Sequence, residues 1–163
     1  MRAILTFVAA VVFVLKITSA VTLDEGPTDQ IVKLESLVGE TLLVLKKLID
    51  ELKGALAAGQ FNGSSSIAET AAGTVQGLQL ISNITETLLQ HSQYERYRTI
   101  TSSLRIIHNT CARLAIELEK LIPIVEAGKF SDESLVTAAN INQQMDVGHN
   151  LLKRYLQMLI ETS

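Results

Sequence analysis

The stretch IVKLESLVGETLLVLKKLIDELKGA, residues 31 to 55, decides the fold class of this chain. Its core-type residues recur at alternating intervals of three and four, the spacing that keeps side chains on one face of an α-helix. This stripe consists of Ile31, Leu34, Val38, Thr41, Leu45, Leu48, Leu52 and Ala55. Pro27 and Thr28 precede it and are typical of a helix start. The stretch therefore predicts a long helix, to which Leu42 and Ile49 add apolar surface beyond the stripe.

Two further segments repeat this periodicity. The first follows Ser66, which can form an N-terminal capping box with Glu69. Its stripe is Ile67, Ala71, Thr74, Leu78, Ile81, Thr85 and Leu88. The second follows another capping box, formed by Ser92 and Glu95. Its stripe is Leu104, Ile107, Cys111, Leu114, Leu118, Leu121 and Val125. Pro123 predicts a kink or an early end of this helix, because proline lacks a main-chain N–H and clashes with the preceding turn.

A fourth helix is predicted from near Ser131 to about Glu161, with acidic residues in its first turn, where they oppose the helix dipole. In the middle of this helix, two alternative sets of residues could form the buried side. The first set is Asn142, Met145 and His149. The second set is Ile141, Met145, Gly148, Leu152, Tyr155 and Leu159.

No segment shows the alternation typical of a β-strand, and the predicted connections are short. Short connections make successive helices antiparallel neighbours. We therefore predict an all-α fold, an up-down-up-down four-helix bundle formed by one domain of residues 21 to 163. Its two helical hairpins would cover about 28 to 91 and 92 to 162.

The two hairpins resemble each other when the chain is shifted by 126 − 57 = 69 residues, which aligns AAGQF (57 to 61) with EAGKF (126 to 130). The alignment indicates an internal duplication. Gly59 is expected to end the first helix in the left-handed conformation. Phe61 and Phe130 should gather at one end of the bundle, where they either close the core or form an apolar gate for a ligand.

Residues 1 to 20 are predicted to be a secretory signal peptide: Arg2 precedes an apolar run, and small residues precede the cleavage point. No later segment has the roughly 20 apolar residues of a membrane anchor, so we expect an extracellular protein without an integral anchor. Without Arg2 and Lys16 the chain keeps 14 − 2 = 12 basic residues against 17 acidic ones. This negative balance disfavours nucleic acid as a partner.

Two N-glycosylation sequons fit the secretory route: Asn62-Gly-Ser64 and Asn83-Ile-Thr85. In the second predicted helix, two residues correspond to a rotation of about 200°. Asn83 should therefore face solvent while Thr85 faces the core.

Cys111 is the only cysteine, so no disulfide can form within the chain. Its place in the third stripe favours a buried, inert thiol. The alternative is a disulfide between two molecules.

Catalytic and metal-binding motifs are absent from the sequence. His91, His108 and His149 lack the spacing of metal ligands, and no nucleophile is paired with a base in a known catalytic motif. We expect no enzymatic activity, no cofactor and no metal.

A partner surface is predicted along the third helix from Tyr94, Tyr97, Arg98, Arg105 and His108. Tyrosine and arginine are enriched in binding hot spots. The alternative is an ordinary boundary, where long amphipathic side chains cover the edge of the core.

Two functions remain open. One is a protein that binds an extracellular protein partner, in signalling, defence or a reproductive fluid. The alternative is an extracellular carrier of a hydrophobic small molecule such as a lipid, because Ala72, Gly73 and Gly77 leave space in a strongly aliphatic core. A homodimer would also cover the surplus apolar surface.

Overall fold

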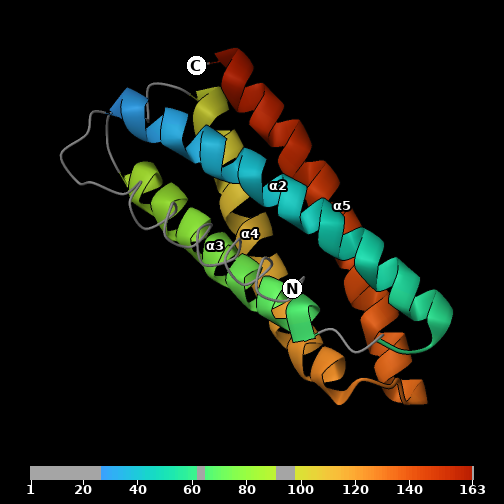
Figure 1. Ribbon diagram of the computed structural model, residues 1–163. Coiled ribbons are helices and arrows are strands. Elements are labelled where there is room, and N and C mark those ends of the chain that lie inside the picture. The colour runs from blue at the N-terminus through green and yellow to red at the C-terminus, as the bar shows by residue number, and fades with distance from the viewer. Residues whose placement is uncertain (1–26, 62–64, 91–97, 163) are drawn as a thin grey trace.

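The computed structural model describes residues 27–61, 65–90 and 98–162. They form the helices α2 (Pro27–Ala58), α3 (Ser65–Gln90), α4 (Arg98–Ala127) and α5 (Asp132–Thr162), drawn in Figure 1. Within these ranges no strand occurs, and β-type pairing is limited to an isolated bridge between Gln60 and Lys129. The prediction of an all-α protein with four helices is confirmed.

Each helix packs against two of the others, which produces a helical bundle. α3 contacts α2 and α4, and α5 also contacts α2 and α4. The contact between α3 and α4 is the most extensive, and that between α2 and α3 is the least extensive of the four. α3 and α5 are therefore diagonally opposite across a shared core, as are α2 and α4.

Every residue of the three predicted stripes is buried, so the periodicity identified the core faces of α2, α3 and α4. The stripes include threonines because the main-chain carbonyl four residues earlier in a helix can accept a hydrogen bond from a buried threonine hydroxyl. Thr41 Oγ1 donates to the carbonyl of Leu37 at 2.7 Å, and Thr74 Oγ1 donates to that of Thr70 at 2.7 Å. A hydroxyl bonded in this way can be buried without the cost of an unpaired polar group.

On α5 the buried residues are Ala138, Ile141, Asn142, Met145, Gly148, Leu152 and Leu159. These residues follow the second predicted set and add Asn142 from the first, whereas His149 and Tyr155 are half-buried. Gly148 explains why α5 buries the second set of residues. A Cβ atom at this position would lie 2.5 Å from Leu114 Cδ1 of α4. Any other residue at this position would force the Leu114 side chain to move.

The end of α4 and the start of α3 differ from the predictions made from the sequence. α4 continues through Pro123 to Ala127, so of the two predicted effects of this proline, a kink or an early end, the early end does not occur. Pro123 is exposed, and the burial of Leu121 and Val125 on the core side holds this last part of α4 in place. α3 begins at Ser65, one residue before the predicted cap Ser66.

The start of α5 agrees with the sequence. The main-chain N–H of Ser134 donates to Ser131 Oγ at 3.1 Å, and that of Leu135 donates to the Ser131 carbonyl at 2.8 Å. Ser131 therefore caps the helix. The predicted Ser92–Glu95 capping box and signal peptide lie outside the described residues.

Candidate functional site

Two equivalent turns meet at one end of the bundle, where α2 and α4 finish (Figure 1). Gly59 has φ 72° and Gly128 has φ 79°, and both follow directly after a helix. The N–H of Gly59 donates to the Leu56 carbonyl at 3.3 Å, and that of Gly128 donates to the Val125 carbonyl at 3.1 Å. Both are left-handed helix ends of the kind that favour glycine. The expected cap at Gly59 is confirmed.

The two turns also contact each other directly. Gln60 and Lys129 form the antiparallel bridge, and the N–H of Phe61 donates to the Gly128 carbonyl at 3.0 Å. The ring centroids of Phe61 and Phe130 are 5.0 Å apart, at an interplanar angle of 51°. Phe61 is 6% exposed and packs in the core, and Phe130 is half-buried against it. The structure thus brings both predicted aromatics together over the end of the core.

The predicted partner surface on the third helix is described only in part. Tyr94 and Tyr97 lie outside the described residues, and Arg98 is described only as the first residue of α4. Arg105 is exposed. His108 is half-buried.

His108 joins α4 to α3. Its Nδ1 lies 2.8 Å from the main-chain oxygen of Ser82 and 3.0 Å from Ser82 Oγ. Because a carbonyl oxygen only accepts, the shorter contact assigns the proton to Nδ1, and the ring donates to α3. Sequence reasoning missed this contact, since it depends on how α3 and α4 are rotated against each other.

The two sequons differ in what can be described. Asn62 lies outside the described residues. Asn83 is exposed on α3, as the helical spacing predicts. Thr85, the hydroxyl residue of the same sequon, is buried.

Cys111 is fully buried in the core of α4. Burial raises the pKa of its thiol, because the charged thiolate would lose its hydration. A thiol in this environment is unreactive, since the thiolate is the form that attacks.

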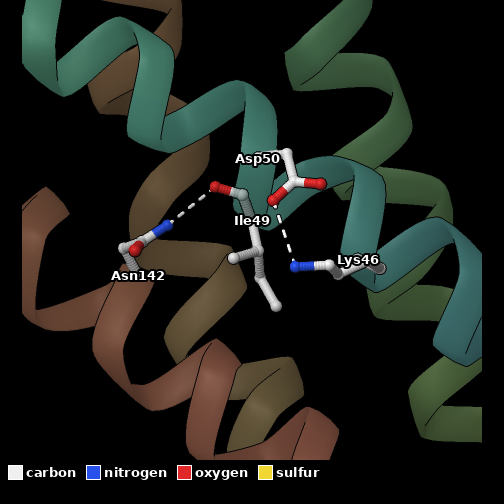
Figure 2. A network of polar contacts seen from close by, with 4 residues as sticks. All are labelled: Lys46, Ile49, Asp50 and Asn142. Carbon is white, nitrogen blue, oxygen red and sulfur yellow. Dashed lines mark hydrogen bonds and ion pairs between the residues drawn. The ribbon is translucent and has the colours of Figure 1, made fainter.

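The contact between α2 and α5 contains a buried polar group, shown in Figure 2. Asn142 Nδ2 of α5 donates to the main-chain oxygen of Ile49 in α2 at 3.1 Å. On the same part of α2, Lys46 Nζ lies 3.2 Å from Asp50 Oδ1 in an exposed ion pair. Such surface pairs contribute little to stability. The amide of Asn142 is thus a buried polar link between α2 and α5, in addition to their apolar packing.

His149 lies further along the same side of α5 and is half-buried. Loss of hydration lowers the pKa of His149 below its usual value. The positive charges of Lys46 and Lys153 lower it further, whereas Asp146 and a hydrogen bond with Asn150 oppose this shift. Folding therefore favours the neutral imidazole of His149 over its charged form, relative to the unfolded chain.

Large apolar side chains are exposed on three of the four described helices. They are Val32 and Leu43 on α2, Leu135, Val136, Val147 and Ile160 on α5, and Ile116 on α4. Leu43 is the most exposed of them, at 75%. The described part of α3 contributes none. We call the six side chains on α2 and α5 the α2–α5 apolar set.

No family model, curated protein or solved structure matches this chain. The geometry of the described residues is therefore the basis for any functional proposal.

The described residues contain no group of three or more histidine, cysteine, aspartate or glutamate side chains placed to hold a metal ion. None of the described helices combines the length and apolarity required to cross a bilayer. What the described surface offers is apolar contact area on two adjacent helices and, at one pole, a pair of hydrogen-bonded turns.

Proposed function

We propose that this protein is a secreted, N-glycosylated, non-enzymatic helical protein that binds an extracellular protein partner, in signalling, defence or a reproductive fluid. The observation that carries the proposal is the α2–α5 apolar set. Single exposed apolar residues are ordinary on protein surfaces, but a concentration on one side is typical of an interaction site. Among the residues that the structure describes, six of the seven exposed large apolar side chains lie on the adjacent helices α2 and α5.

Helical spacing aligns members of this set. Val32 and Leu43 are 43 − 32 = 11 residues apart on α2, and Val136 and Val147 are 147 − 136 = 11 residues apart on α5. Eleven residues bring a helix back to within about 20° of the same direction. Each pair therefore lies along one side of its helix, as an elongated contact surface requires.

The architecture proposed for this binding protein is an up-down-up-down bundle of two similar hairpins. The pairing of helix contacts supports this order, since each helix contacts those next to it along the chain and α2 also contacts α5. The matched turns support the duplication. Gly59 and Gly128 have the same left-handed backbone conformation, and Phe61 and Phe130 occupy equivalent positions after them, with their rings in contact. A rigid bundle would present the α2–α5 apolar set to a partner without an ordering cost.

Secretion and glycosylation are proposed from the signal peptide over residues 1 to 20 and the sequons at Asn62 and Asn83. The exposure of Asn83 supports the second sequon, because a glycan needs open space around the amide. Asn83 lies on α3, diagonally opposite α5. A glycan there would leave the exposed side of α5 uncovered.

The test uses the secreted, tagged full chain to isolate its partner from extracellular fluid, followed by affinity measurement with the purified partner. Leu43→Ser and Val147→Ser each remove one apolar side chain of the α2–α5 apolar set. We expect each to weaken binding by about tenfold, or about 1.4 kcal/mol. Ile116→Ser on α4 is the matched control and should bind as the unmodified chain does.

Equal effects of all three substitutions, or no effect of any, would contradict a binding site on α2 and α5. In that case the exposed Arg105 and the predicted surface around it become the site to test next, with Arg105→Ala.

The alternative proposal is a carrier of a lipid-like molecule, favoured by small buried residues on α3. Ala68, Ala71 and Gly77 are buried there, whereas Ala72 and Gly73 are half-buried. The contact of α3 with α2 is the least extensive of the four helix contacts. Separation of α2 from α3 would open an apolar space lined by these residues. A carrier should yield extractable lipid after purification and displace a fluorescent fatty acid, with Phe61 and Phe130 as the gate.

Native mass spectrometry of the deglycosylated protein distinguishes these proposals from a homodimer in one measurement. A bound lipid adds its mass to the monomer, whereas a homodimer doubles the mass. A monomer without added mass leaves the protein-binding proposal.

A further inference from the structure

We propose that Asn83 receives its glycan only before α3 has folded into the bundle. The inference rests on the proposed passage of the chain through the secretory route. It concerns the timing of the modification at this one site.

The sequon Asn83-Ile84-Thr85 is split between two sides of α3. Asn83 is exposed, whereas Thr85 has 0% of its surface exposed. Thr85 Oγ1 lies 2.9 Å from the main-chain oxygen of Ile81 and 2.8 Å from that of Ser82. The hydroxyl is therefore both buried and occupied as a donor within the helix.

The glycosylation signal requires a serine or threonine hydroxyl two residues after the asparagine. A transferase that reads both side chains must meet them on one side of the chain. In a helix, residues two positions apart are rotated by about 200° and point away from each other. An enzyme that approaches the exposed amide of Asn83 on folded α3 cannot also contact the Thr85 hydroxyl.

The reaction itself forms one bond and breaks one. The amide nitrogen of Asn83 attacks the first sugar carbon of an oligosaccharide carried on a lipid diphosphate. A carbon–nitrogen bond forms, the carbon–oxygen bond to the diphosphate breaks, and the lipid diphosphate leaves with that electron pair. The amide loses one proton, which the leaving diphosphate takes up. The reaction therefore needs no reactant besides the asparagine and the lipid-linked oligosaccharide.

Exposure of Thr85 in the folded protein would require opening of the bundle. Ile81 and Leu88, on either side of Thr85 in the stripe, are fully buried. The bond from His108 to the Ser82 carbonyl joins the same turn of α3 to α4. Modification of the folded chain would therefore depend on the small fraction of molecules in which this part is open.

The experiment compares folded and unfolded full-length chains as acceptors. Chains produced without glycosylation carry Asn62→Gln, so that Asn83 is the remaining acceptor among the two predicted sequons. One chain is otherwise unchanged. The second carries Leu78→Asp, which places a carboxylate in the core outside the sequon and prevents folding, as circular dichroism would verify. Both receive solubilised oligosaccharyltransferase and a lipid-linked oligosaccharide.

We expect the Leu78→Asp chain to gain the glycan mass and the folded chain to be modified at least about 100-fold more slowly, in line with its small unfolded fraction. Leu78→Ala, which weakens the fold, should give an intermediate rate. Asn83→Gln should abolish the mass gain in every chain.

The proposal is overturned if the folded chain is modified as fast as the Leu78→Asp chain. It is also overturned if the Leu78→Asp chain is not modified, because the sequon is then unusable in any state. Failure of the proposed partner binding would leave both results unchanged, since this assay involves neither a partner nor the α2–α5 apolar set.

Discussion

Phe61 and Phe130 face each other with ring centroids 5.0 Å apart, although 130 − 61 = 69 residues separate them in the chain. Tilted aromatic pairs at this distance contribute about 0.5–1.5 kcal/mol beyond the area they bury. The hydrogen bond from the Phe61 N–H to the Gly128 carbonyl holds the main chains of both turns in register beneath the rings. The turns that follow α2 and α4 thus stabilise each other.

Phe61→Ala should lower the free energy of unfolding by about 3 kcal/mol, because a nearly fully buried ring is removed from the core. Phe130→Ala should cost less, since this ring is only half-buried. Urea unfolding of both variants and of the double variant measures the coupling, expected at about 0.5–1.5 kcal/mol. Additive effects would show that the ring contact itself contributes nothing. Loss of ligand binding without loss of stability would instead support the gate.

Gly148→Ala should destabilise the protein by about 1–3 kcal/mol, because the added methyl group would overlap Leu114. Leu114 is fully buried and has little room to move. Thermal unfolding measures the effect, and Gly39→Ala in α2 is the control. Apart from its chain neighbours and the adjacent main chain of α2, no heavy atom lies within 4 Å of a Cβ at Gly39. That variant should therefore gain about 0.5–1 kcal/mol from reduced main-chain freedom. Equal results for the two variants would contradict the close packing of α4 on α5.

Cys111 should react with an aromatic disulfide reagent only when the bundle opens. The thiol is buried, and its raised pKa removes the reactive thiolate. Labelling in native buffer should therefore be slow and should accelerate in step with unfolding by urea or by Leu118→Ala. Non-reducing gels of the folded protein should show no disulfide-linked dimer. Complete labelling within the mixing time would show that Cys111 is accessible.

Acid should weaken the contact between α2 and α5 through His149. The pKa of His149 in the folded chain lies below its unfolded value of 6.5, so the unfolded chain binds the proton more readily. The contribution to stability is full above this unfolded value and is lost as pH falls through it toward the folded pKa. Urea unfolding at pH 7.5 and 5.5 should show a smaller pH-dependent loss in His149→Gln than in the unmodified chain. A loss of equal size in both chains would assign the effect to other groups.

The helical stripes could be predicted from the sequence because burial in a bundle follows one simple period. Each predicted position of α2, α3 and α4 is buried, including Thr41 and Thr85, whose hydroxyls find partners inside their own helices. The pattern of α5 was ambiguous because Asn142 and Gly148 are not hydrophobic, yet both are buried. Their burial depends on particular partners, namely the Ile49 carbonyl and the Leu114 side chain.

The candidate sites were less predictable where they depend on a partner in another helix. The exposure of Asn83 and the burial of Cys111 follow from helical position alone. The contact of His108 with Ser82 requires the rotation of α4 against α3, which periodicity does not specify. The exposed apolar residues of α2 and α5 do not follow from the core period, because that period specifies which side of a helix is buried and not what its outward side carries.

The unequal outward sides of the four helices should also give the bundle a preferred orientation at a boundary between water and an apolar phase. Leu43 and Val147 project from α2 and α5, whereas the outward side of α3 carries mainly amides and hydroxyls, such as Gln76, Gln79 and Thr87. Molecules adsorbed at such a boundary should turn α2 and α5 toward the apolar phase and Asn83 toward water. A layer of this protein would then present one uniform, wettable surface.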